Sequence, residues 1–359
     1  MYYMYWKDLQ GGVNTMIQNL VSYRVFSSAS LLGIETVWWK RRDISRIKNA
    51  IYASIGDSRN PIIVCQGPLL LMIAKLILPG SKLILHIHNH PVYDSWLVQL
   101  LTYAAGLVSY KLYFVSPGLK NHGLFPFLLM FKKYDIVSPL WNIRLPDKLN
   151  NSFLMSCSSG GCKRPAVLIS TRWHPTKNIE YLIEYYSKHN PECDVYILSD
   201  SDMISAMVAH VSCNRIFYAD YSHSKFNQLA GKCQFILSLS RQEGFCLSLL
   251  EGMSHGLIPL APLGSCGPSY IIDGAPYPLA FRLKCLDSLL YTIHYICKDA
   301  SRYRAVSDWS LSRSHDLHQL SLMKWKAIAS RYWFGPRQRN HLNPIIFYFA
   351  FAVDCLSWF

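Results

Sequence analysis

The sequence predicts an α/β protein with two Rossmann-like domains that face each other across a cleft. The first observation is length, because 359 residues exceed what a single core usually holds. The second is composition, since 51% hydrophobic and 16% charged residues supply apolar surface for two cores and exclude a disordered chain. The third is the alternation of short apolar runs with longer mixed segments, which is typical of parallel strands joined by helices.

This alternation occurs twice and is interrupted once. In the first half, strands are expected at 1–5, 34–38, 62–66, 83–88 and 112–115, with helices at 13–23, 69–78 and 95–105. In the second half, strands are expected at 166–170, 194–198, 215–218, 235–239 and 258–261, with helices at 179–188 and 247–255. Residues 146–164 lose this periodicity and gain Ser, Gly and Asn, which indicates a linker. We therefore predict domains at 1–150 and 166–330, a linker at 151–165, and a tail at 331–359 that docks on the N-terminal domain or on a membrane.

The net charge of +14 predicts an anionic partner. Residues 1–150 carry 16 Lys and Arg against 7 Asp and Glu, a balance of +9, and the remainder carries 20 against 15, a balance of +5. In the first half, basic residues are interleaved with apolar runs such as 124–134, which favours an anionic membrane surface; the alternative for this run is a core segment under a basic rim. No helix-turn-helix or RNA-binding aromatic motif is recognisable, so no nucleic-acid partner is predicted.

The cysteines and the first residues indicate a cytoplasmic protein. The eleven cysteines show no zinc-ligand spacing and are expected to be reduced thiols. Residues 1–6 lack the charged-then-apolar layout of a signal peptide. The longest apolar run, 96–115, is interrupted by Gln99, Gly106 and Lys111, so we interpret it as a buried helix and a strand. The predicted location is the cytoplasm, at the inner face of a membrane.

Residues 235–256, FILSLSRQEGFCLSLLEGMSHG, carry the clearest chemical motif. They are expected to form a strand, a turn at Gly244 and a helix whose unpaired amides and dipole favour phosphate. The amides in question belong to Phe245, Cys246, Leu247 and Ser248. Glu243, before the turn, is placed to accept hydrogen bonds from the hydroxyls of a transferred sugar, and Glu251, one turn into the helix, from a ribose diol.

A diphosphate beside two carboxylates requires cations, and the segment 169–178 supplies Arg172 and Lys177. Both follow an expected strand and can stabilise the charge that develops on a departing diphosphate. With these two residues, no divalent metal and no other cofactor is required. The alternative is a metal ion held by Asp200 and Asp202, which also follow a strand, although paired acids in a loop more commonly cap a helix.

The run EGFCLSLLEGMSHGLIP at 243–259, followed by GSCGPSYIIDG at 264–274, resembles the signature of the group 1 retaining glycosyltransferases of GT-B architecture. The resemblance covers nearly the whole chain. It implies transfer of a hexosyl group, with retention, from a nucleotide-sugar donor to a lipid-linked or polysaccharide acceptor in cell-surface polysaccharide synthesis. It also implies that Glu243 contacts the donor sugar and Glu251 the ribose, while Arg172 and Lys177 contact the diphosphate. The base is expected at residues 217–221, FYADY, which begin with Phe217.

The resemblance extends to the first half of the chain. Gly11 and Gly12 match a Gly-Gly turn after the first strand, where missing side chains let the backbone approach a phosphate or an acceptor. The family also places a histidine at the end of a central strand. His86, His88 and His90 share one face of such a strand, and we assign the role to His88, the one nearest the end of the strand. A neutral buried histidine and a His-rich metal site are the alternatives.

Two other classes of function are compatible with these motifs. A nucleotide-sugar epimerase or a phosphorylase on the same scaffold would use the same phosphate-binding parts. A non-enzymatic basic protein that binds a membrane surface would not need Glu243 or Glu251.

Overall fold

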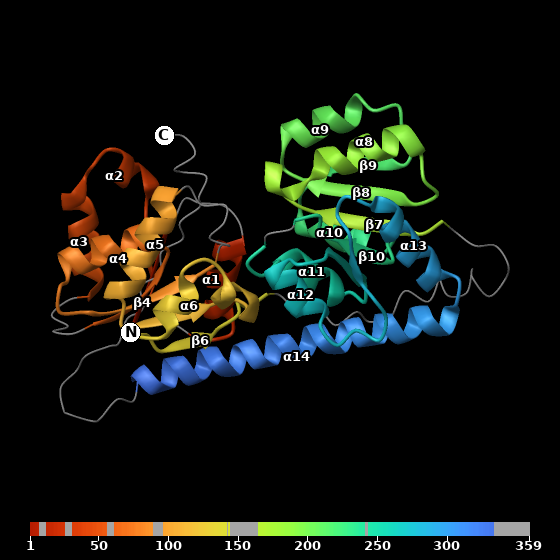
Figure 1. The fold of residues 1–359 in the computed structure, drawn as a ribbon. Helices are drawn as coiled ribbons and strands as arrows, with labels where there is room; N and C mark the ends of the chain where they lie inside the picture. Colours follow the sequence, from red (N-terminus) through yellow and green to blue (C-terminus); the bar gives the residue numbers. More distant parts are fainter. Residues whose placement is uncertain are drawn as a thin grey trace. The chain divides into compact units, whose positions relative to one another are not determined.

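The computed structural model describes residues 1–6, 12–25, 31–55, 61–88, 96–141, 143, 164–240 and 243–333. Gly11, His90 and most of the predicted linker and tail lie outside the described residues. The chain divides into two compact units, and their elements are labelled in Figure 1. Unit 1 comprises residues 1–141 and 319–359, and unit 2 comprises residues 142–318. The second division falls inside the helix α14 (Ala300–Trp333).

In its described residues, unit 1 is built on a six-stranded sheet with the order β2-β1-β3-β4-β5-β6, in which neighbouring strands pair in parallel. The strands are β1 (Tyr2–Trp6), β2 (Leu31–Ile34), β3 (Ile62–Gln66), β4 (Lys82–Ile87), β5 (Lys111–Phe114) and β6 (Tyr134–Ile136). The helices are α1 (Gly12–Ser22), α2 (Thr36–Lys40), α3 (Ile44–Ile55), α4 (Pro68–Ile77), α5 (Trp96–Val108), η3 (Pro117–Asn121) and α6 (Phe125–Leu129).

The described part of unit 2 contains a second six-stranded parallel sheet, with the order β12-β11-β10-β7-β8-β9. The strands are β7 (Ala166–Ser170), β8 (Asp194–Ser199), β9 (Ile216–Asp220), β10 (Phe235–Leu237), β11 (Ile258–Pro262) and β12 (Ala280–Phe281). The helices before α14 are η4 (Pro175–Lys177), α8 (Ile179–His189), α9 (Asp202–Ala209), α10 (His223–Ala230), α11 (Leu247–Met253), α12 (Cys266–Ile272) and α13 (Leu286–Cys297). The two sheets confirm the predicted α/β fold with two Rossmann-like units.

The strands of unit 1 are apolar along most of their length because helices connect and cover a parallel sheet. Polar side chains are buried where three neighbouring strands end. Gln66 is the last residue of β3, His86 the penultimate residue of β4, and Ser116 follows β5; each is at most 2% exposed. The carboxyl edge of this sheet therefore carries buried polar groups.

One predicted strand, 34–38, is wrong. The strand β2 ends at Ile34 and the helix α2 begins at Thr36, with the Trp38 amide donating to the Glu35 carbonyl at 3.1 Å. Val37 and Trp38 are residues that strands favour, but propensity is a weak guide where tertiary context decides. In contrast, the strands predicted at 62–66 and 166–170 are confirmed at both ends.

The helix α14 is attached to both units through side chains that bond to backbone carbonyls. In unit 2 three serine hydroxyls donate to backbone carbonyls. Ser307 donates to Gly256 at 2.7 Å, Ser310 to Leu257 at 2.6 Å and Ser314 to Leu250 at 3.1 Å. In unit 1 the Ser321 hydroxyl (2.6 Å) and the Trp325 indole (2.9 Å) both donate to the Ser138 carbonyl. These donors recur at spacings of three, four and seven residues, so they lie along one face of the helix.

Candidate active site

The loop after β7 carries both predicted cations and is fixed by an asparagine. Asn178 has a φ of 53°, and its amide donates to the carbonyls of Thr176 and Leu239 at 2.9 Å each. Leu239 follows β10, which pairs with β7 in the sheet. The asparagine thus ties together the ends of two neighbouring strands, and the residues that follow each strand are held close.

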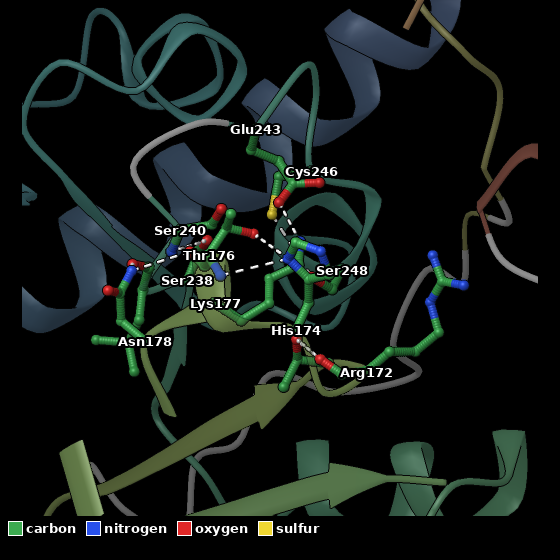
Figure 2. A network of polar contacts seen from close by, with 12 residues as sticks. Arg172, His174, Thr176, Lys177, Asn178, Ser238, Ser240, Glu243, Cys246 and Ser248 are labelled. Carbon is green, nitrogen blue, oxygen red and sulfur yellow. Dashed lines mark hydrogen bonds and ion pairs between the residues drawn. The ribbon is translucent and has the colours of Figure 1, made fainter. Parts of the chain in front are cut away.

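Lys177 and Glu243, 66 residues apart in the sequence, form an ion pair with a hydrogen bond between these two strand ends (Figure 2). Their side chains are 27% and 24% exposed. Burial acts to lower the pKa of Lys177, but the charge and hydrogen bond of Glu243, together with a contribution from Cys246, raise it overall. The ammonium group therefore stays charged at neutral pH and supplies a fixed positive charge at the carboxyl edge of the sheet.

Arg172 lies in the same loop and opposes the protonation of Lys177, so the two cations interact electrostatically. In Figure 2 its side chain is directed away from the pair formed by Lys177 and Glu243. Of the two predicted cations, one is held by a carboxylate and the other extends outward from the loop.

The turn between Glu243 and α11 has a strained backbone. Cys246 is the residue before the helix and has φ 77° and ψ 75°, a left-handed conformation that non-glycine residues rarely adopt. Its sulfur lies 3.5 Å from the hydroxyl oxygen of Ser248. Burial raises the pKa of the Cys246 thiol, and the charge of Glu243 raises it further, so the thiol is neutral. Strained backbone of this kind is often found at functional sites.

The turn is supported from behind by a glycine. A Cβ atom added at Gly267 would lie 2.4 Å from the Phe245 Cα atom, which leaves no room for any side chain. The Gly267 amide also donates to the Glu243 carbonyl at 2.9 Å. The Phe245 side chain is buried and packs near Tyr270, with ring centroids 6.5 Å apart. Phe245 can therefore contribute to a site only through its backbone, together with the preceding Gly244.

Glu251 lies one turn into α11, beyond the half-buried Leu247 and Ser248. Burial raises its pKa to about 7. Burial also raises the pKa of Tyr221 to about 12, and the charge of Glu251 adds to this rise, so the two side chains interact. A ligand that donates hydrogen bonds to Glu251, such as a diol, would favour the ionised carboxylate.

Phe217 is not brought to this group of residues. It is the second residue of β9 and stacks on Tyr196 of β8, with ring centroids 4.9 Å apart and an interplanar angle of 22°. Tyr221 directly follows β9, is 41% exposed, and interacts with Glu251. Within the predicted base-binding region, the aromatic residue nearest the glutamate is thus Tyr221.

In unit 1, His86 and His88, the two candidate histidines that the structure describes, are in contact. The rings of His86 and His88 have centroids 4.2 Å apart, and His86 Nε2 lies 3.0 Å from the Val137 carbonyl. Burial lowers the pKa of His86 to about 3 despite that carbonyl. Burial also lowers the pKa of His88, and repulsion from His86 lowers it further. Both rings are therefore neutral at physiological pH.

The same edge of unit 1 presents polar atoms that a ligand could satisfy. The Gln66 Oε1 and Ser116 Oγ atoms are buried and have no hydrogen-bond partner among the described residues. A buried polar group without a partner is costly, so such atoms often mark a binding position. Gly12, from the predicted Gly-Gly turn, is the first residue of α1 after β1.

Asp200 and Asp202, the alternative metal ligands, lie at the start of α9. Ser201 precedes this helix and Asp202 lies in its first turn, where a carboxylate interacts favourably with the helix dipole. In the part of the chain that the structure describes, no group of three or more His, Cys, Asp or Glu residues is arranged to hold a metal ion.

Two residues that shape the site, Asn178 and Gly267, were missed from the sequence. The sequence did contain an indication for Asn178, because asparagine is common at the position directly before a helix. Gly267 lies in a short Gly-rich run, but only the packing against Phe245 shows why a glycine is needed there. Tyr221 stood at the end of the region proposed for the base.

The fold and the site together define an α/β protein of GT-B type with a charged pair at the carboxyl edge of its second sheet. By sequence, the chain matches no protein-family model and no curated protein. Among solved structures, it is similar to Anabaena Alr3699/HepE, solved with UDP-glucose, at 12% identity and a TM-score of 0.70, covering 92% of this chain and 98% of HepE.

Two further structures have the same fold. The lipopolysaccharide outer core galactosyltransferase WaaB is 14% identical, with a TM-score of 0.59, and 92% of this chain and 99% of WaaB are covered. TarM is 15% identical, with a TM-score of 0.63 over 80% of this chain; the chain spans 58% of the length of TarM. At such low identity, the similarity establishes the fold that this chain shares with these proteins.

Proposed function

We propose that this chain is a glycosyltransferase that moves a hexosyl group from a nucleotide-sugar donor to a hydroxyl of a lipid-linked or polysaccharide acceptor, with retention, at an anionic membrane surface in cell-surface polysaccharide synthesis. The observation that carries the proposal is the ion pair between Lys177 and Glu243 beside the first turn of α11, with Glu251 one turn further. Structures with the same fold include HepE with UDP-glucose and the galactosyltransferase WaaB. UDP is therefore the first nucleotide to test.

The arrangement suits a donor diphosphate at the start of α11. In the free protein, Glu243 neutralises Lys177. A bound diphosphate would offer Lys177 a more highly charged partner, and Glu243 would become available to accept hydrogen bonds from the sugar hydroxyls. Arg172, which extends from the same loop, would contact the outer phosphate. Glu251 would accept from the ribose diol, beside the aromatic ring of Tyr221.

The transfer breaks the bond between the anomeric carbon and the diphosphate oxygen, and the electron pair leaves with the diphosphate. The acceptor hydroxyl oxygen bonds to the anomeric carbon from the same face, and its proton passes to a donor phosphate oxygen. Lys177 stabilises the charge that develops on the leaving diphosphate, while Glu243 orients the donor sugar. We propose that Lys177 and Arg172 together make a divalent metal unnecessary, so EDTA should leave the activity unchanged.

In unit 1 we propose that His88 and the turn at Gly11 and Gly12 contact bound sugar. Because burial keeps the His88 ring neutral, it can donate one hydrogen bond or accept one, as a sugar hydroxyl requires. Its neutrality also argues against a role as a cation for phosphate.

Thermal unfolding with a panel of nucleoside diphosphates and nucleotide sugars tests the donor site. A ligand at about 100 times its Kd stabilises the folded protein by about 2.7 kcal/mol, so one member of the panel should raise the Tm clearly. Lys177→Met should abolish the shift, whereas an exposed change such as Lys188→Met should not. The absence of a shift with every nucleotide would overturn the proposal.

Product analysis separates the alternatives. A glycosyltransferase releases the nucleoside diphosphate only when an acceptor is glycosylated. An epimerase would convert the nucleotide sugar without any acceptor, and a phosphorylase would need inorganic phosphate. A non-enzymatic binding protein would keep its function in Glu243→Ala and Glu251→Ala variants.

A further inference from the structure

A cluster of large apolar side chains is exposed on unit 1, on α5 and on the segment around α6. Its members are between 52% and 76% exposed: Trp96, Leu97, Leu100, Leu107, Leu124, Phe127, Met130 and Phe131. We call this surface the α5–α6 face. Single exposed apolar side chains are ordinary on a protein surface, but a gathering of this kind marks a site of interaction.

The helix α5 contains no charged residue, and most of its side chains are apolar. One side, with Val98, Ala105 and Gly106, is buried. The opposite side, which includes Leu100 and Leu107, is exposed. A helix without a polar face is ordinarily enclosed on all sides by protein or lipid. The exposed side of α5 is therefore apolar and is not packed against protein in the part of the chain that the structure describes.

The segment around α6 packs beside α5. The helices α5 and α6 touch at Gly106, where an added Cβ atom would lie 2.7 Å from a Leu128 methyl group. The Leu124 amide also donates to the Tyr103 hydroxyl of α5 at 2.8 Å. Beyond this contact, the exposed rings of Phe127 and Phe131 pack on each other with centroids 5.4 Å apart.

Lysines without acidic neighbours in the sequence lie in the same stretch of the chain as this face. Residues 96–134 contain four lysines and no acidic residue. Lys111 is paired with Asp135, the next acidic residue along the chain. Lys120, Lys132 and Lys133 form no ion pair within the described residues. Lys132 bonds to the Ser109 carbonyl at 2.8 Å, which places its ammonium group at the C-terminal end of α5.

We propose that the α5–α6 face docks the protein on an anionic phospholipid bilayer, with Phe127, Met130 and Phe131 at the boundary between headgroups and acyl chains and the lysines on the headgroups. The proposal rests on the proposed membrane-linked function and specifies its surface. Exposed apolar side chains with lysines in the same segment suit anionic lipid. A second copy of the chain, in contrast, would bring like charges together. In the part of the chain that the structure describes, no helix is long and apolar enough to cross a membrane.

Vesicle sedimentation of the full chain tests this proposal. We expect the protein to sediment with phosphatidylglycerol-containing vesicles at low salt and to be released by high salt, and not to sediment with pure phosphatidylcholine. The double variant Phe127→Ser, Phe131→Ser should lose at least about tenfold in vesicle affinity, because two apolar side chains no longer insert. Lys133→Gln should lose about fivefold. Met203→Ser, which removes a 48% exposed side chain from α9 of unit 2, is the matched control and should bind like the wild type.

Three results would overturn the docking surface: no binding of the wild type to anionic vesicles, wild-type affinity in the phenylalanine double variant, or self-association in place of vesicle binding on ultracentrifugation. Binding that persists in the double variant and disappears on deletion of residues 344–359 would assign the contact to the tail. The UDP-dependent Tm shift should be unchanged in the double variant, which confirms that it is folded. A wild type that binds vesicles and no nucleotide would refute the proposed function and leave the docking surface standing.

Discussion

Replacement of Glu251 with glutamine is expected to stabilise the free protein and to weaken donor binding. Burial raises the pKa of Glu251 from 4.5 to about 7. Each pKa unit corresponds to about 1.4 kcal/mol, so the ionised carboxylate lowers the free energy of unfolding by about 3 kcal/mol above pH 7. The folded protein holds this proton more tightly than the unfolded chain does. The stability that the protonated Glu251 carboxyl group gives the folded protein is therefore fully present below about pH 4.5 and is lost as the pH rises to about 7. Glutamine keeps the shape, carries no charge and should remove this dependence.

Urea unfolding at two pH values measures the effect. The expected gain in the free energy of unfolding for Glu251→Gln is about 1 kcal/mol near pH 5 and about 3 kcal/mol near pH 8. Glu192→Gln, at an exposed position between α8 and β8, is the control and should change neither value. A gain that is equal at both pH values, or absent, would refute the reasoning from burial. With UDP present at the higher pH, the wild type should gain stability and the variant much less.

Three further predictions follow from packing and hydrogen bonding. Gly267→Ala should lower the free energy of unfolding by about 3 kcal/mol, because a Cβ atom there meets backbone, and should abolish the UDP-dependent Tm shift. Gly264 has open space around it and a φ of 83°, so Gly264→Ala should lower the free energy of unfolding by only about 1 kcal/mol in a urea titration. Lys177→Met should destabilise the protein by about 1–3 kcal/mol, because it leaves a partly buried carboxylate without its partner, and equal stability of variant and wild type would contradict the ion pair. Ser310→Ala should lose about 1–2 kcal/mol, since a buried carbonyl loses its donor, whereas Ser330→Ala, at an exposed position on the same helix, should stay within about 0.5 kcal/mol.

The parts of the fold that could be predicted from the sequence are those whose buried positions are occupied by aliphatic side chains. The strand at 62–66 reads IIVCQ and the strand at 166–170 reads AVLIS, and the structure confirms both. The turn and helix around Glu243 could also be predicted, because a glycine turn before a helix is recognisable in a short stretch of sequence. The helix begins at Leu247, as predicted, and ends at Met253.

The helix α14 was not predicted, and its composition explains why. Much of the face that packs on the rest of the protein consists of serines, such as Ser307, Ser310 and Ser314, in place of the leucines or isoleucines that a periodicity search detects. Contacts between distant segments were equally hidden. No local pattern indicates that Gly267 must fit against the backbone of Phe245, or that the amide of Asn178 reaches the end of β10.

The serine contacts of α14 also determine which positions can change during evolution. The acceptors are main-chain carbonyls, at Leu250, Leu257 and Ser138, and every amino acid supplies such a carbonyl. A side-chain change at an acceptor position leaves the hydrogen bond available, whereas the loss of a hydroxyl from the helix removes it. Mutational tolerance is therefore asymmetric across this interface. The carbonyl acceptors beneath the helix do not depend on the identity of their side chains, while the helix itself must keep its small hydroxylated residues in register.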